Sequence, residues 1–109
     1  MFTLENGINH VTMKWYKENL KGKINICDTN ITDYNVTELE NVIKDIISNI
    51  SIGNIAVTDK YVVVEGRKRI YAINAFIDGK IKFSNKYYAE LPKEEFNNFN
   101  NYELGIFVG

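Results

Sequence analysis

The sequence has very little cysteine, proline and histidine: each occurs once in 109 residues, as Cys27, Pro92 and His10. One cysteine cannot form a disulfide within the chain, and a lone thiol is typical of proteins in the reducing cytoplasm. One cysteine and one histidine also fall short of the ligand sets that hold structural zinc, so we expect no metal site. With no repeat or low-complexity stretch, residues 1–109 are predicted to form a single domain.

Long apolar runs and a net charge are missing as well. No apolar run approaches the roughly 20 residues that a membrane-spanning helix needs, so we expect no membrane partner. The 13 Lys and Arg residues against 14 Asp and Glu residues give a formal charge of −1 at pH 7, which provides no general attraction to nucleic acid. Residues 60–86 are the exception, with seven Lys or Arg and two acidic residues. An anion, if the chain binds one, is therefore expected in this middle segment.

The hydrophobic pattern predicts an α+β fold, a small mixed sheet flanked by helices. Strands are predicted at residues 23–27, 54–58, 61–65, 80–83 and 102–108. Helices are predicted at residues 12–21, along an apolar stripe from Val36 to Ile50, after Gly66 and after Pro92. Thr37 and Glu40 have capping-box spacing. The uninterrupted valines at 62–64 indicate a strand covered on both faces, hence a central one.

Residues 1–22 form an N-terminal extension whose structure the pattern leaves ambiguous. Asn6-Gly7 is typical of a hairpin turn, whereas Met13, Tyr16 and Leu20 recur at helical spacing. We interpret residues 12–21 of this extension as a short helix.

The main chemical feature is the run Arg67-Lys68-Arg69, placed directly after Glu65-Gly66, where a predicted strand gives way to a predicted helix. Cations in the first turn of a helix are unfavourable by about 0.3–1 kcal/mol each, because the helix N-terminus is already partly positive. An anion bound there removes this conflict, and Gly66 lets it approach the backbone closely. The run predicts a phosphate-binding site formed by Gly66, Arg67, Lys68 and Arg69. A solvated helix end, with Glu65 as an ion-pair partner, is the alternative interpretation.

This segment resembles the acidic-Gly-x-[Gln/Arg]-Arg segment of the ParB/sulfiredoxin superfamily, and most of all the N-terminal domain of GmrSD-type, modification-dependent restriction enzymes. The likeness covers most of residues 24–108. It implies nucleotide handling, with phosphate contacts from the glycine and the basic residues and a nucleoside triphosphate with Mg²⁺ as cofactor. For Glu65 it implies a catalytic part, orienting an arginine or assisting a metal. The matching positions are Glu65, Gly66, Arg67, Lys68, Arg69, Ile70, Ala72, Phe76, Gly79 and Lys80.

The departures from this family pattern point away from catalysis. Glu65 replaces the usual Asp, Arg67-Lys68 replace Gln-Gln, and Ile31 stands near the place of an arginine that belongs to the active cleft in the relatives. The leading hypothesis is a stand-alone ParB-like domain that binds nucleotide or nucleic-acid phosphate with weak or no catalysis. The alternative is a phage or mobile-element anti-defence protein, an anti-CRISPR or anti-restriction inhibitor that binds a host nuclease complex. A minimal nuclease using Glu65 is a third possibility.

Overall fold

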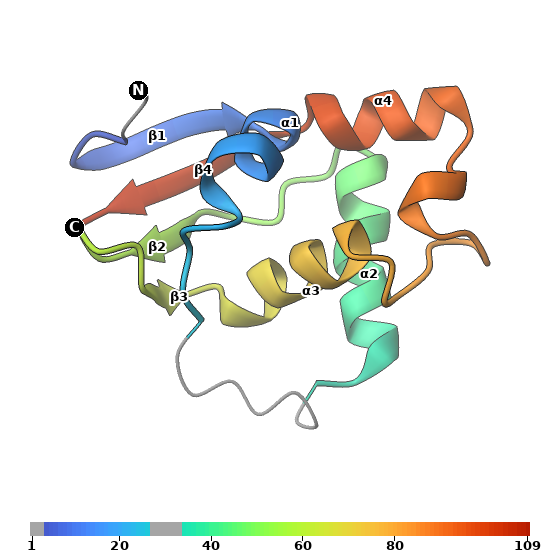
Figure 1. Cartoon of the computed structure of the whole chain (residues 1–109), viewed down its shortest axis with the longest axis horizontal. Helices are drawn as coiled ribbons and strands as arrows, with labels where there is room; N and C mark the ends of the chain where they lie inside the picture. The colour runs from blue at the N-terminus through green and yellow to red at the C-terminus, as the bar shows by residue number, and fades with distance from the viewer. Residues whose placement is uncertain (1–3, 27–33) are drawn as a thin grey trace.

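One mixed sheet of four strands is present in the part of the chain that the computed structural model describes, residues 4–26 and 34–109 (Figure 1). The strands are β1 (Gly7–Thr12), β2 (Ile55–Val57), β3 (Val63–Glu65) and β4 (Glu103–Val108). Their spatial order is β1-β4-β2-β3. β4 pairs antiparallel with β1 and parallel with β2, while β2 and β3 form an antiparallel hairpin. The predicted α+β class is confirmed.

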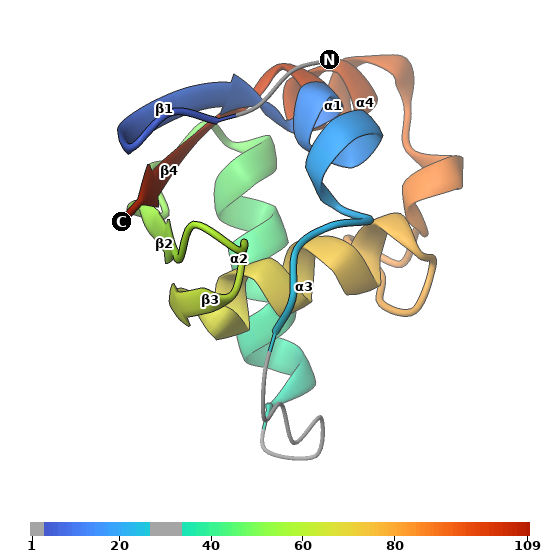
Figure 2. The same ribbon diagram turned by 60° about the vertical axis from the view of Figure 1, so that its left-hand side comes forward.

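The helices gather on one face of this sheet (Figure 2). They are α1 (Met13–Trp15), its π-helical continuation η1 (Tyr16–Leu20), α2 (Val36–Ile47), α3 (Arg67–Ile77), the 3₁₀ turn η3 (Tyr88–Glu90) and α4 (Lys93–Asn101). The side chains of β4 show which face of the sheet is covered: Leu104, Ile106 and Val108 are buried, whereas Phe107 is 43% exposed. The core therefore lies between the helices and one sheet face, and the other face is open.

α2 follows the predicted apolar stripe, although its two ends differ from the prediction. The buried members of the stripe are Leu39, Val42, Ile43, Ile46 and Ile47. Val36 and Ile50 are exposed, because Val36 lies in the first turn and the helix ends before Ile50. The predicted capping box of Thr37 and Glu40 is wrong: Asn35 is the N-cap, and its Oδ1 accepts from the Thr37 amide at 2.7 Å. This asparagine cap begins the helix at Val36, so Thr37 lies inside the first turn and its amide is the one that the cap satisfies.

The prediction of a central strand at residues 62–64 is wrong, because β3 lies at the edge of the four-stranded sheet. Val63 is buried but Val64 is 55% exposed. Beyond β3, a single parallel bridge joins Val62 to Asn25. This bridge lies within the strand predicted at residues 23–27, of which Cys27 falls outside the described residues.

Two further elements differ from the sequence pattern. Residues 80–83 do not form a strand; Phe83 and Lys86 form an isolated bridge across Ser84 and Asn85, both left-handed with φ of 51° and 64°. Residues 80–83 alternate between polar and apolar side chains, as a strand does, but they pair with no strand of the sheet. β1, by contrast, was not predicted, although it pairs with β4 along its whole length. The hydrophobic pattern of β1 is weak, because Asn9 lies on the covered face of the sheet and Ile8 lies on the exposed face.

The predicted helix at residues 12–21 is confirmed as α1 and η1. It buries Tyr16, whose hydroxyl donates to Oδ1 of Asn74 on α3 at 2.6 Å. Burial raises the pKa of the Tyr16 hydroxyl well above its ordinary value, and the negative charge of Asp78 raises it further. The neutral phenol is therefore the form that the folded chain stabilises.

A Tyr16→Phe substitution is expected to cost about 1 kcal/mol at pH 7, because Asn74 loses its donor. Above pH ~10 the unfolded wild-type chain ionises Tyr16 whereas the folded chain does not, so ionisation favours unfolding. The wild-type protein thus loses stability with rising pH, and the variant lacks this loss. Urea denaturation from neutral pH to pH ~11 should show the gap between the two proteins narrowing; a constant gap would contradict the shift.

Candidate phosphate-binding corner

The predicted strand–glycine–helix corner is present: β3 ends at Glu65 and α3 begins at Arg67 (Figure 1). Gly66 between them is the N-cap of α3 and has a left-handed backbone, with φ of 92°. A Cβ atom on Gly66 would lie 2.6 Å from Cδ1 of Ile55 and 3.2 Å from Nη2 of Arg69. Glycine takes this conformation at no steric cost, and its lack of a Cβ leaves room for the side chains of Ile55 and Arg69. The corner formed by residues 65–69 therefore depends on Gly66 for its shape.

The first turn of α3 has neither a side-chain cap nor an acidic residue. The carbonyl of Gly66 accepts from the Ile70 amide at 3.0 Å, so the N–H groups of residues 67–69 have no acceptor within the helix. α2 differs, because Asn35 caps it and Glu38 lies in its first turn. The start of α3 is thus a partly positive helix end to which the sequence adds further positive charge.

The three consecutive cations do not converge, since neighbouring residues lie about 100° apart around a helix. Lys68 points to α2, where its Nζ lies 3.5 Å from Oε2 of Glu38. Both side chains are exposed, and such a pair contributes about 0–1 kcal/mol. Arg67 is exposed and forms no hydrogen bond or ion pair with any residue in the described part of the chain. The two outward-facing cations are therefore free, or nearly free, to contact a ligand.

Arg69 has a structural task that its position in a basic run does not reveal. Its Nη1 donates to the carbonyl of Ile52 at 2.6 Å and to that of Asn54 at 3.2 Å. The guanidinium lies against Gly53, where an added Cβ would be 2.9 Å from Nη1. Arg69 thereby ties the segment before β2 to the start of α3. Nη2, which lies beside Gly66, has no acceptor among the described residues and remains the group that can face a ligand.

Glu65, the predicted catalytic residue, is exposed at the end of β3, where its backbone pairs with Ala56 of β2. It makes no ion pair with the described residues, so it does not orient Arg67 or Arg69 here. Across residues 4–26 and 34–109, no group of three or more His, Cys, Asp or Glu side chains could hold a metal ion. Ile31, which stands near the arginine position of the relatives, lies outside the described residues.

The corner thus combines free backbone amides, Gly66 and three basic side chains that diverge from one helical turn, and Arg69 also supports the fold. No protein-family model, curated protein or solved structure matches this chain. Its likeness to the ParB/sulfiredoxin superfamily therefore stays a prediction. No helix in the described ranges is long and apolar enough to cross a membrane.

The sequence pattern located the corner but did not indicate Ile52 or Asn54, whose carbonyls accept from Arg69. The available signal was Gly53, which lies between them and beside the Arg69 guanidinium.

Proposed function

We propose that this chain binds a phosphate group of a nucleotide or nucleic acid at the Glu65–Arg69 corner, with weak or no catalysis. The observation that carries the proposal is the first turn of α3, which has three cations but no acidic residue and no side-chain cap. Free amides at a helix N-terminus combined with basic side chains are a common means of holding phosphate. A bound phosphate would relieve the repulsion between these cations and the helix dipole.

Each residue of the corner has a distinct part in this proposal. The N–H groups of Arg67 and Lys68 donate to phosphate oxygens, and Gly66 admits them to the backbone. The side chains of Arg67 and Lys68 close over the anion, Lys68 giving up only its weak exposed pair with Glu38. Arg69 contributes Nη2 while Nη1 keeps its two carbonyl acceptors.

Glu65 would supply one carboxylate ligand to the Mg²⁺ that accompanies a triphosphate. Magnesium keeps several waters and takes one or two carboxylates in addition to the phosphates. The weak or absent catalysis rests on the family pattern, because Ile31 stands near the place of the relatives' cleft arginine. We place the function in the cytoplasm, since the single Cys27 leaves no internal disulfide.

An inhibitor that binds a host defence nuclease is the second candidate, favoured by the open sheet face. A row of paired residues crosses all four strands on that face: Ile8 of β1, Phe107 of β4, Ala56 of β2 and Glu65 of β3. Ile8 and Phe107 are 48% and 43% exposed. Exposed apolar side chains beside an unpaired edge strand are typical of protein-binding surfaces.

Thermal unfolding with and without a nucleoside triphosphate and Mg²⁺ tests the proposal. A ligand at 100 times its Kd adds about 2.7 kcal/mol to the free energy of unfolding, so the Tm should rise by several degrees. The double variant Arg67→Ala, Lys68→Ala should keep the fold but bind about 100-fold more weakly, because two charge-assisted contacts are lost. Added salt should weaken binding to the wild-type protein as well.

The matched control is Lys93→Ala. Lys93 is the first residue of α4, as Arg67 is of α3, and α4 also lacks a side-chain cap, but its first turn holds Glu94 and Glu95. Its loss should leave the response to triphosphate unchanged. If neither triphosphate nor DNA changes the Tm at micromolar concentrations, the phosphate proposal fails. A stoichiometric complex with a host nuclease under the same conditions would then support the inhibitor.

A further inference from the structure

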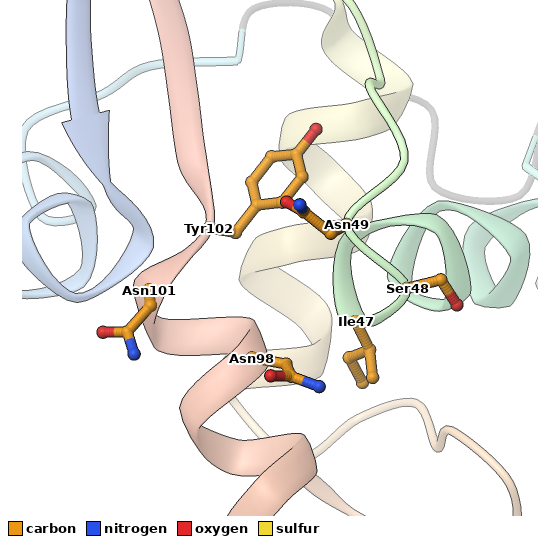
Figure 3. Close-up of a pocket in the computed structure, with 6 residues that line it drawn as sticks. All are labelled: Ile47, Ser48, Asn49, Asn98, Asn101 and Tyr102. Carbon is orange, nitrogen blue, oxygen red and sulfur yellow. The ribbon is translucent and has the colours of Figure 1, made fainter.

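A pocket of about 450 Å³ lies where α2 and α4 both end, away from the residues of the Glu65–Arg69 corner (Figure 3). Its size is within the range of small-molecule sites. In Figure 3 the Asn98 side chain points from α4 toward the end of α2. The lining residues are Ile47, Ser48, Asn49, Asn98, Asn101 and Tyr102.

A second pocket of about 500 Å³ adjoins the first, because both are lined by Ser48. It continues along the exposed side of α2 to the turn at Ser84 and Asn85, which is closed by two hydrogen bonds between Phe83 and Lys86. Of the four non-glycine residues with positive φ in the described ranges, Asn49, Ser84 and Asn85 line these two pockets. A ligand seated in the first pocket thus has room to extend across Ser48.

The chemistry of the first pocket is neutral and rich in carboxamides. No lining side chain is charged, and the carboxamides of Asn49, Asn98 and Asn101 make no hydrogen bond with the described residues. Each carboxamide offers a donor and an acceptor side by side. Two helix C-termini meet here as well and add partial negative charge. The carbonyls of Asp45, Ile46 and Phe99 already accept backbone amides. The acceptors left at the end of α2 are therefore the carbonyls of Ile47 and Ser48. The pocket therefore disfavours an anion and suits a neutral ligand with exposed N–H donors.

The walls of this pocket are fixed by bonds that do not use the carboxamides. The Tyr102 hydroxyl donates to the carbonyl of Ile50 and accepts from the amide of Ile52, both at 3.0 Å. The amide of Asn49 donates to the Ile46 carbonyl and that of Ile50 to the Asp45 carbonyl, at 3.0 and 2.8 Å. This pattern is a Schellman motif, in which the left-handed residue is Asn49.

We propose that this pocket binds a nucleobase with an exocyclic amino group, as the free base or nucleoside. The paired donor and acceptor of an asparagine carboxamide match the amino and ring-nitrogen edge of adenine. The helix-end carbonyls accept the remaining amino hydrogen, and the apolar surfaces of Ile47 and Tyr102 face the flat ring. The inference rests on the pocket alone and does not depend on phosphate binding at the corner.

Isothermal titration of the full chain with adenosine, and with inosine for comparison, tests the proposal. Inosine carries an oxygen in place of the amino group, so it should bind at least about tenfold more weakly than adenosine. The Arg67→Ala, Lys68→Ala variant removes most phosphate binding at the corner, and in it adenosine monophosphate should bind no better than adenosine, because its phosphate approaches two negative helix ends. Equal binding of inosine, tighter binding of a disaccharide than of adenosine, or no binding at millimolar concentrations overturns the proposal.

Variants of the lining asparagines locate the site without endangering the fold. Asn98→Ala and Asn101→Ala place a better helix former on exposed positions of α4, and Asn49→Gly keeps the left-handed backbone. Each should leave the Tm at or above the wild-type value and weaken adenosine binding about fivefold. Asn97→Ala, an exposed position of α4 outside the pocket, is the control and should bind as the wild type does. Wild-type affinity in all three pocket variants would overturn the assignment.

Discussion

A Gly66→Ala variant is expected to lose about 2–4 kcal/mol of unfolding free energy, the largest effect of any single methyl group at the corner. The left-handed backbone, with φ of 92°, costs a residue with a Cβ roughly 1–2 kcal/mol. The added carbon would also lie 2.6 Å from Cδ1 of Ile55, and such overpacking costs about 1–3 kcal/mol. Urea denaturation should show a lower midpoint with an unchanged slope.

Gly22→Ala is the matched control for this substitution. Gly22 has no positive φ, and no atom lies within 4 Å of a Cβ placed on it. Removing backbone freedom from the unfolded chain should leave this variant as stable as the wild type, or slightly more so. Equal stability of the Gly66→Ala and Gly22→Ala variants would contradict the geometry assigned to the corner.

Arg69→Ala is expected to lower the free energy of unfolding by about 2–3 kcal/mol. The substitution removes the charged donor from the carbonyls of Ile52 and Asn54, and hydrogen bonds to charged groups contribute about 1.5–3 kcal/mol. The Tm should fall by roughly 10 °C or more, given 4–8 °C per kcal/mol for a domain of this size. Differential scanning calorimetry measures both quantities.

Arg67→Ala is the comparison, because Arg67 stands in the same turn but makes no bond with the described residues. It should keep wild-type stability or gain a few tenths of a kcal/mol, since it removes a cation from a helix N-terminus. Arg69→Lys should recover only part of the loss, because one ammonium group does not reproduce the guanidinium fork. A fully stable Arg69→Ala variant would mean that the guanidinium is not needed to hold the segment before β2.

Periodic hydrophobic patterns made most of the fold predictable. α2 has a continuous apolar stripe, α3 changes period directly after Gly66, and β4 is a short apolar run in which Glu103 and Phe107 are exposed. Each of these elements buries one face against the same core, so its pattern is strong. β2 and β3 were predicted as strands from the apolar runs at residues 54–58 and 61–65.

The errors arose where long-range pairing outweighed the local pattern. β1 owes its existence to six residues of pairing with β4, which lies near the other end of the chain. The valines at residues 62–64 predicted a central strand, but Val64 is exposed at the sheet edge. Strand order depends on which distant segments meet, and the composition of one strand does not contain that information.

The site could be located from the sequence, but the roles of its residues could not. The change of period at Gly66 and the three adjacent cations mark the corner. Adjacent helical residues diverge, however, so Lys68 meets Glu38 and Arg69 meets the backbone at Ile52. A carbonyl acceptor has no signature in a sequence, because every residue carries one.

The most direct test of the proposed phosphate site is a titration of ¹⁵N-labelled protein with a nucleoside triphosphate and Mg²⁺, followed by amide NMR. The amides of Arg67 and Lys68 should show the largest chemical-shift changes, because they lie in the uncapped first turn of α3. The amides of β1, at the opposite edge of the sheet from β3, should change little. Unchanged Arg67 and Lys68 amides at saturating triphosphate, or changes confined to another part of the chain, would contradict phosphate binding at this corner.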